Sequence, residues 1–207
     1  MNLALTYPHL AEQLVPGRSV IRSVVLVAAF SFFTALLAQI SIPLPWTPVP
    51  ITGQTLAVLL TGAVLGPRLG FVTLMVYLAE GAVGLPVFAG GTGGFSKLLG
   101  PTGGYLIAFP LAAGLVGWLA TRGWDRRPLW MVLAMAVGSA IIYVLGVTWL
   151  GVWLGFSGKF PGLLPLLNMG MFPFLPGDAI KAGVAMVVLP TAWRFVKSRD
   201  RSNELRD

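Results

Sequence analysis

The sequence contains no cysteine and one histidine, His9, among its 207 residues. It therefore has no disulfide, thiolate metal site or cysteine nucleophile, and a single histidine near the start is too little for a metal centre or histidine-based catalysis. Charged residues make up 10% of the chain, against roughly a quarter in soluble proteins, while 56% are hydrophobic. We expect an integral membrane protein without a cofactor, and we attribute its net charge of +7 to membrane topology rather than to nucleic acid.

Nucleotide-binding motifs are absent as well, although residues 86–105 (PVFAGGTGGFSKLLGPTGGY) are rich in glycine. Lys97 is followed by Leu98, not by the Ser or Thr of a P-loop. A dinucleotide fingerprint would need a third glycine where Ser96 stands. Without a P-loop the chain cannot hydrolyse ATP by that chemistry, so active transport would need another subunit.

The glycine-rich segment is the one place where the membrane-helix pattern stops. Seven of its twenty residues are glycine, which disfavours helix and lets backbone amides approach a ligand. We expect a binding loop or lid on the extracellular side. The alternative is a glycine-rich connector that binds nothing.

Apolar runs predict an all-α integral membrane protein, a bundle of six transmembrane helices. The runs are residues 23–40, 53–66, 69–83, 103–121, 128–154 and 176–196. Four prolines in residues 42–50 predict an extended bend after the first run, and Pro67-Arg68 predicts a tight turn after the second. Prolines in residues 155–177 exclude a regular spanning helix there, so we expect a partly buried loop.

The basic residues support a bundle with both termini in the cytoplasm. In that topology all 14 lysines and arginines except Lys97, Lys159 and Lys181 lie in cytoplasmic segments. We expect one membrane domain, with residues 1–17 as a cytoplasmic leader, residues 18–196 as the bundle and residues 197–207 as a solvated or disordered charged tail. The predicted location is the inner (plasma) membrane, as a multi-pass protein.

Polar side chains gather at the outer end of the predicted bundle. Asp178 and Lys181 are three residues apart and share a helical face. They can bind a polar ligand, or Asp178 can cap its helix and pair with Lys181. Gln54, Lys97 and Tyr105 lie at the same end of the predicted bundle. Each can contact a ligand or have a purely structural role. These residues predict a pocket that opens to the exterior.

Glu80 lies near the end of the third predicted span, where the sequence gives it no single role. Small residues four apart in the first span, Ser31 with Ala35 and Thr34 with Ala38, permit close helix packing, either within the bundle or against a partner. The sequence leaves open whether the chain forms a homo-oligomer.

Three segments resemble the BioY family, the biotin-specific substrate-binding S component of energy-coupling factor (ECF) transporters. They are PVPITGQTLAVLLTGAVLGPRLG (48–70), EGAVGLPVFAGGTGGFSKLLGPTGGYLIAF (80–109) and PGDAIK (176–181). The resemblance extends from about residue 20 to residue 196. It implies a six-helix protein that binds biotin beneath a lid at its outer face and is energised by a separate transmembrane coupling subunit with two ATPase subunits.

The resemblance also implies roles for individual residues. Asp178 and Lys181 match the family's ligand-contacting PGDxxK segment, and Tyr105 matches the tyrosine that closes GPTGGY. S components dock the coupling subunit through a small-residue face of the first helix, which would include Ser31 and Ala35 here.

Biotin carries a ureido group with donors and an acceptor, an apolar middle and a carboxylate. Asp178 with Lys181 fits the ureido group, and Lys97 with loop amides, including those of Gly91 and Gly93, fits the carboxylate. Either lysine can meet either end of the ligand.

Three other functions are alternatives to biotin binding. The chain would be an S component for another vitamin, such as thiamine or riboflavin, if the PGDxxK segment and the glycine-rich block did not occur together. It would be a scaffold if Asp178 and Lys181 bound nothing. An intramembrane enzyme needs paired acids, a Ser-Lys pair or a metal set within a span, whereas these charges sit at one end. We therefore expect a binding protein and not an enzyme.

Overall fold

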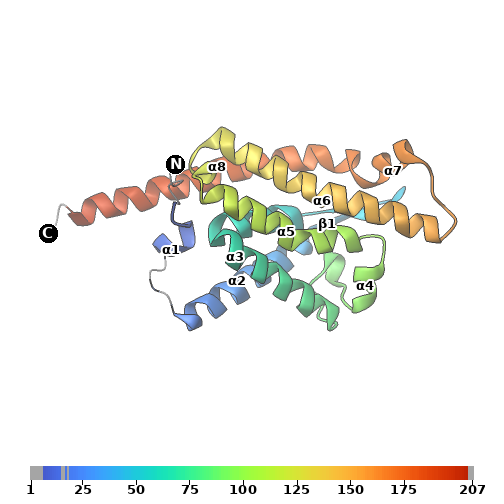
Figure 1. The fold of residues 1–207 in the computed structure, drawn as a ribbon, viewed down its shortest axis with the longest axis horizontal. Coiled ribbons are helices and arrows are strands. Elements are labelled where there is room, and N and C mark those ends of the chain that lie inside the picture. Colours follow the sequence, from blue (N-terminus) through green and yellow to red (C-terminus); the bar gives the residue numbers. More distant parts are fainter. Residues whose placement is uncertain (1–6, 15–16, 18, 205–207) are drawn as a thin grey trace, which may run out of the picture.

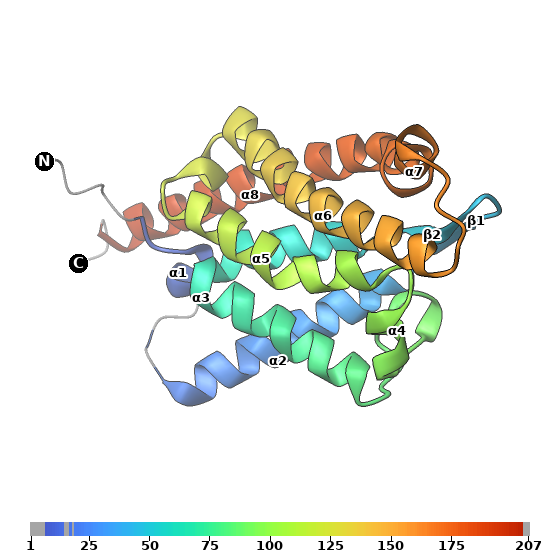
Figure 2. The same ribbon diagram turned by 45° about the vertical axis from the view of Figure 1, so that its right-hand side comes forward.

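The computed structural model describes residues 7–14, 17 and 19–204. It is mostly helical, and five segments are long and apolar enough to cross a membrane. These are α2 (Val20–Ala38), α3 (Gln54–Ala82), α5 (Gly103–Ala120), α6 (Pro128–Phe156) and residues Leu163–Val196, which include most of α8 (Leu175–Glu204). Figures 1 and 2 show these helices packed side by side as a bundle. The prediction of a multi-helix membrane bundle is confirmed.

Helix α3 consists of two helical halves that fold back on each other. Gly66 interrupts it with φ 81° and ψ 179°, a conformation that side-chain-bearing residues rarely adopt, and Pro67 starts the second half. Near the other ends of the two halves, the Gln54 side-chain nitrogen donates to the Tyr77 hydroxyl over 2.6 Å. The turn predicted at Pro67-Arg68 is thus present inside α3. That six segments cross the membrane stays a prediction.

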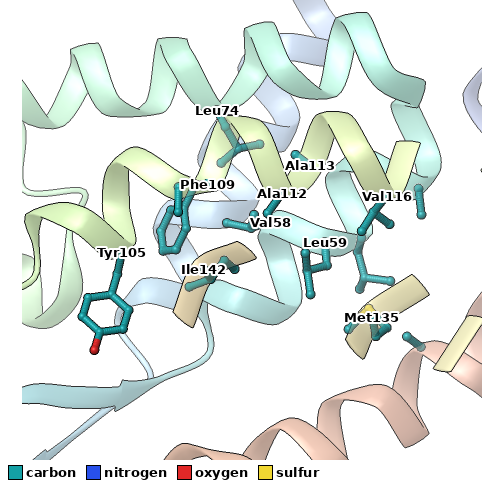
Figure 3. Packing of buried hydrophobic residues seen from close by; sticks show 14 of the residues in the cluster. Val58, Leu59, Leu74, Tyr105, Phe109, Ala112, Ala113, Val116, Met135 and Ile142 are labelled. Atoms are coloured by element: carbon teal, nitrogen blue, oxygen red, sulfur yellow. The ribbon is translucent and has the colours of Figure 1, made fainter. Parts of the chain in front are cut away.

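Helices α3 and α5 touch backbone to backbone at the centre of the bundle. A Cβ atom added to Gly62 would lie 2.1 Å from the carbonyl oxygen of Ala113. One added to Gly117 would lie 2.5 Å from the carbonyl carbon of Gly66. Figure 3 shows the apolar core around this contact, where side chains of α3, α5 and α6 meet: Val58, Leu59, Leu74, Phe109, Val116, Met135 and Ile142.

Helix α2 packs its small residues inward, against α3. Ser31 and Thr34 are fully buried and Ala35 is 9% exposed, while the Ser31 hydroxyl donates to the Glu80 carboxylate. Ser31 and Ala35 are therefore occupied by contacts within the bundle, and docking of a coupling subunit through this face of α2 stays a prediction. The residue spacing suited either use, and the need to partner Glu80 within the bundle fits the internal one.

The proline-rich segment after α2 forms a β-hairpin rather than a simple bend. Strand β1 (Ser41–Leu44) pairs antiparallel with β2 (Thr47–Thr52), in the register Ser41 to Thr52. The sheet has only these two strands in the part of the chain described, so both are edge strands, which tolerate proline. The Thr47 hydroxyl donates to the Met169 carbonyl over 2.8 Å and so ties the hairpin to the segment before α8.

Three predicted loops or tails contain helix. The glycine-rich segment holds η1 (Ala89–Gly91) and α4 (Phe95–Leu99), because the run FSKLL between Gly94 and Gly100 has no glycine. Residues 155–177 hold α7 (Leu163–Gly170) and η3 (Phe172–Phe174). Helix α8 continues past Val196 to Glu204, since residues 191–204 contain neither proline nor glycine, and residues 205–207 lie outside the described chain.

The start of the described chain packs against the end of the bundle opposite the hairpin (Figure 2). Helix α1 (Leu10–Leu14) follows His9, whose ring fills the space beside Gly66. The Tyr7 backbone N–H donates to the Thr121 carbonyl over 2.8 Å. The Arg126 guanidinium lies between the rings of Tyr7 and Trp193, at 4.4 and 4.0 Å from their centroids.

Basic residues separate between the two ends of the bundle. Lys97 and Lys181 line one cavity near the hairpin, whereas Arg22, Arg68 and Arg122 line another beside α1. This separation agrees with the charge asymmetry of the predicted topology. That the arginine end faces the cytoplasm stays a prediction.

A buried carboxylate joins the short helix η2 (Trp124–Arg126) to α8. Asp125 is 2% exposed, and its Oδ2 accepts a hydrogen bond from Trp193 Nε1 over 2.5 Å. Burial raises the pKa of Asp125 from 3.8 to about 6, although the Trp193 hydrogen bond and the Arg126 charge act in the opposite direction.

We predict that Asp125 makes the folded state less stable as pH rises. A raised pKa means that the folded protein binds the proton more tightly than the unfolded one, so this contribution falls between about pH 4 and 6 and is constant above that range. In Asp125→Asn, the amide oxygen can still accept from Trp193 but does not titrate. Thermal unfolding in detergent at pH 5 and 7 should show the wild type losing on the order of 1 kcal/mol relative to the variant. Equal pH dependence of the two proteins would contradict this.

Candidate ligand-binding site

A cavity of about 260 Å³ lies at the hairpin end of the bundle, close in size to the smaller ligand pockets of proteins. Its wall combines β2, α3, α4, α5, α6 and α8, so residues far apart in sequence meet there. It brings together five of the seven predicted site residues: Gln54, Lys97, Tyr105, Asp178 and Lys181.

Asp178 and Lys181 form the ion pair that their spacing predicted. Lys181 Nζ lies 3.1 Å from Asp178 Oδ1, and the side chains of Lys181 and Asp178 are 15% and 16% exposed. Tyr143 donates its hydroxyl hydrogen to Asp178 Oδ2 over 2.5 Å, and Lys181 Nζ also donates to Thr55 Oγ1 over 2.7 Å. These partners hold both charges at the cavity wall, where the side chains are largely buried and an unpaired charge would be costly.

Lys97 has a different environment. It lies on α4, within the glycine-rich segment, and its side chain is exposed. Within the described chain the Lys97 side chain makes no hydrogen bond or ion pair, so its ammonium group is available to a ligand.

Gln54 and Tyr105 line the cavity with their polar atoms already engaged. Gln54 is 4% exposed and donates to Tyr77, whose own hydroxyl donates to the Val87 carbonyl. The Tyr105 hydroxyl donates to the Gly170 carbonyl over 2.8 Å. Tyr105 therefore offers a ligand its ring more readily than its hydroxyl, and Gln54 ties the start of α3 to the glycine-rich segment.

Gly91 and Gly93 were predicted to contact the ligand, but neither lines this cavity. A Cβ on Gly93 would lie 2.3 Å from the Leu85 carbonyl oxygen, so this glycine serves close backbone packing. Gly91 has φ +68°, which serves the turn of η1. Thr92, between them, does line the cavity.

Several residues of the wall were not predicted from the sequence. Tyr143 and Thr55 hold the ion pair, and an apolar wall includes Phe88, Leu106, Phe109, Ile142 and Phe174. Thr55 could have been found, because it follows Gln54 at the same helix end. Tyr143 could have been noticed as a hydroxyl within a long apolar span, which usually has a partner inside the bundle.

The family model of the BioY family matches residues 9–198. The chain belongs to the BioY family. The probable biotin transporter BioY of Pyrococcus horikoshii is 41% identical over 167 residues, which cover 81% of this chain and 93% of that protein. The biotin transporter BioY of Rhodobacter capsulatus is 38% identical over 185 residues, covering 84% and 94%.

A solved structure of the same kind shares the fold of this BioY-family chain. The crystal structure of the S-component for biotin from an ECF-type ABC transporter superposes with a TM-score of 0.72 at 28% identity. The match covers 86% of this chain and 95% of that one. The resemblance read from the sequence is confirmed, and these relatives are named as transporters, in agreement with the prediction of a transport protein rather than an enzyme.

We predict that Asp178 and Lys181 stabilise the fold only as a pair. Lys181→Met should lower the thermal unfolding temperature in detergent, because a largely buried carboxylate without its cation costs about 1–3 kcal/mol. The double variant Asp178→Asn/Lys181→Met should regain most of that loss, with a coupling free energy of about 1 kcal/mol or more. Lys159→Met, a lysine outside the cavity, is the matched control and should change little. Additive effects of the two changes would contradict the pairing.

Proposed function

We propose that this chain is the biotin-binding S component of an ECF-type uptake transporter, with biotin bound in the cavity at the hairpin end. One observation carries the proposal: a single apolar-walled cavity holds a paired acid and lysine together with a separate, unpaired lysine. That distribution matches a ligand with a neutral polar head, an apolar middle and an anionic tail. The names of the relatives support biotin as that ligand.

The ureido group of biotin would bind at the ion pair. It presents two N–H donors and one carbonyl acceptor, and the Asp178 carboxylate accepts while the Lys181 ammonium donates. Tyr143 and Thr55 hold these two groups in place before the ligand arrives. A pre-positioned site loses less conformational freedom on binding, which favours affinity.

The biotin carboxylate would bind at Lys97. This lysine has no other partner among the described residues, whereas Lys181 already shares its charge with Asp178. Because Lys97 lies within the glycine-rich segment, which also contributes Phe88, Thr92 and Pro101 to the wall, ligand binding would draw this segment over the cavity as a lid. The apolar rings of the wall would pack on the thiophane and valeryl part.

Transport would require other subunits. The sequence has no P-loop, and the structural neighbour is a component of an ECF-type ABC transporter. We propose a transmembrane coupling subunit with two ATPases, acting on a six-span chain whose arginine-rich end faces the cytoplasm and whose cavity opens outward in the inner membrane.

Calorimetry on the purified chain in detergent tests the proposed function. Biotin should bind, while thiamine and riboflavin should not compete. Asp178→Asn and Lys181→Ala should each weaken binding by about tenfold or more, because each leaves a polar ligand atom or a charged partner unpaired. Lys159→Ala is the control for loss of a lysine at the same end. A folded wild type that does not bind biotin would refute the proposal.

A second titration tests the orientation of the ligand. Lys97→Ala should weaken binding of biotin by about tenfold, since a charge-assisted contact is lost. It should leave the affinity for biotinamide, which has no carboxylate charge, nearly unchanged. If Lys97→Ala weakened both ligands equally, Lys97 would not be the carboxylate partner.

A further inference from the structure

A second cavity, of about 570 Å³, lies at the opposite end of the bundle. Arg22 from α2, Arg68 from the second half of α3 and Arg122 just after α5 line it, together with His9 and Glu12. We call it the arginine pocket. It shares no lining residue with the cavity near the hairpin, so the proposed biotin site does not account for it.

The positive charge of the arginine pocket is not neutralised within the described chain. None of its three arginines forms an ion pair there. Arg22 Nη2 donates to the Ala11 carbonyl over 2.7 Å, while its buried Nε has no partner. Glu12, the one acid of the lining, accepts from the His9 backbone N–H. Burial lowers the pKa of His9, more than Glu12 raises it, so the imidazole adds little charge at neutral pH.

The arrangement suits an anion with several oxygens. Each guanidinium offers a planar fork of N–H donors, and three such groups come from three different elements. One guanidinium can pair with both oxygens of a carboxylate, whereas a phosphate has enough oxygens to accept from more than one guanidinium. Arg122 is pre-positioned, because its guanidinium lies 3.2 Å from the centroid of the Trp118 ring.

The surface around the arginine pocket is apolar. Val20 and Ile21, next to Arg22 on α2, are 78% and 75% exposed, and Trp118 is 42% exposed. Exposed aliphatic side chains with a tryptophan at a helix end are typical of the membrane interface. A ligand held there by its phosphate would have these exposed apolar side chains beside it.

We propose that the arginine pocket binds the phosphate of an anionic phospholipid. The three arginines would bind the phosphate group, and the apolar side chains around the pocket favour a lipid over a soluble phosphate ester. Basic pockets between spans on the cytoplasmic side commonly take such head groups, which agrees with the predicted topology.

Native mass spectrometry of the purified chain, titrated with phosphatidylglycerol, tests this. Arg68→Gln and Arg122→Gln should each weaken binding by about fivefold, the effect of one arginine near a charged head group. Arg194→Gln is the matched control, because Arg194 is an exposed arginine outside the pocket. Calorimetry with biotin verifies that each variant is folded. If the two pocket variants bound phosphatidylglycerol as tightly as Arg194→Gln, the proposal would be refuted.

Two further ligands test whether the bound phosphate belongs to a lipid or to a soluble phosphate ester. Diacylglycerol has the chains without the phosphate, so it should bind weakly and without dependence on Arg68 or Arg122; binding as tight as that of phosphatidylglycerol would overturn the proposal. Glycerol 3-phosphate has the phosphate without the chains. Its failure to compete at millimolar concentration would support a lipid, whereas arginine-dependent competition would support the phosphate site and assign it to a soluble ester.

Discussion

The backbone contact between α3 and α5 is the constraint on which both ends of this molecule depend. In a bilayer, helices associate through packing and hydrogen bonding, without the gain from removing apolar surface from water. Gly62 and Gly117 leave no room for a Cβ, so the two helices meet at their backbones. One end of this contact then places Gln54 and Tyr105 at the same cavity. The other end places the turn at Gly66 next to α5, so that Arg68, which follows this turn in α3, and Arg122, just after α5, line one pocket.

The hydrogen-bond and ion-pair partners of the polar side chains explain why the groups that a ligand can reach lie at the two ends of the bundle. Within the bundle, two pairs of polar side chains satisfy one another: Ser31 with Glu80, and Gln54 with Tyr77. Asp178 is likewise partnered, but at the wall of a cavity, so a ligand can reach it. In the described chain, Lys97 and the arginines of the second pocket keep charge without an acidic partner. A ligand with an apolar body and an anionic group therefore suits either end. The polar groups of the ligand determine which of the two cavities binds it.

Much of the fold followed from the sequence because membrane spans are long apolar runs and proline or glycine marks their ends. The spacing of Asp178 and Lys181 correctly predicted their pairing, since neighbours on one helix need no tertiary knowledge. Contacts across the fold were missed for the opposite reason. Tyr143 meets Asp178 only after α6 and α8 pack, and the hairpin forms where a segment 122 residues away provides a partner. Glycines and small residues were ambiguous, because the same pattern serves ligand contact, partner docking or internal packing, as Gly93 and Ser31 show.

We propose that the cavity between the hairpin, α4 and the start of α8 holds biotin. The most direct test is an experimental structure of the chain with biotin bound. We predict ureido nitrogens within hydrogen-bond distance of the Asp178 carboxylate, the valeryl carboxylate at Lys97, and the glycine-rich segment closed over the ligand. Biotin bound elsewhere on the protein, with this cavity empty, would contradict the account.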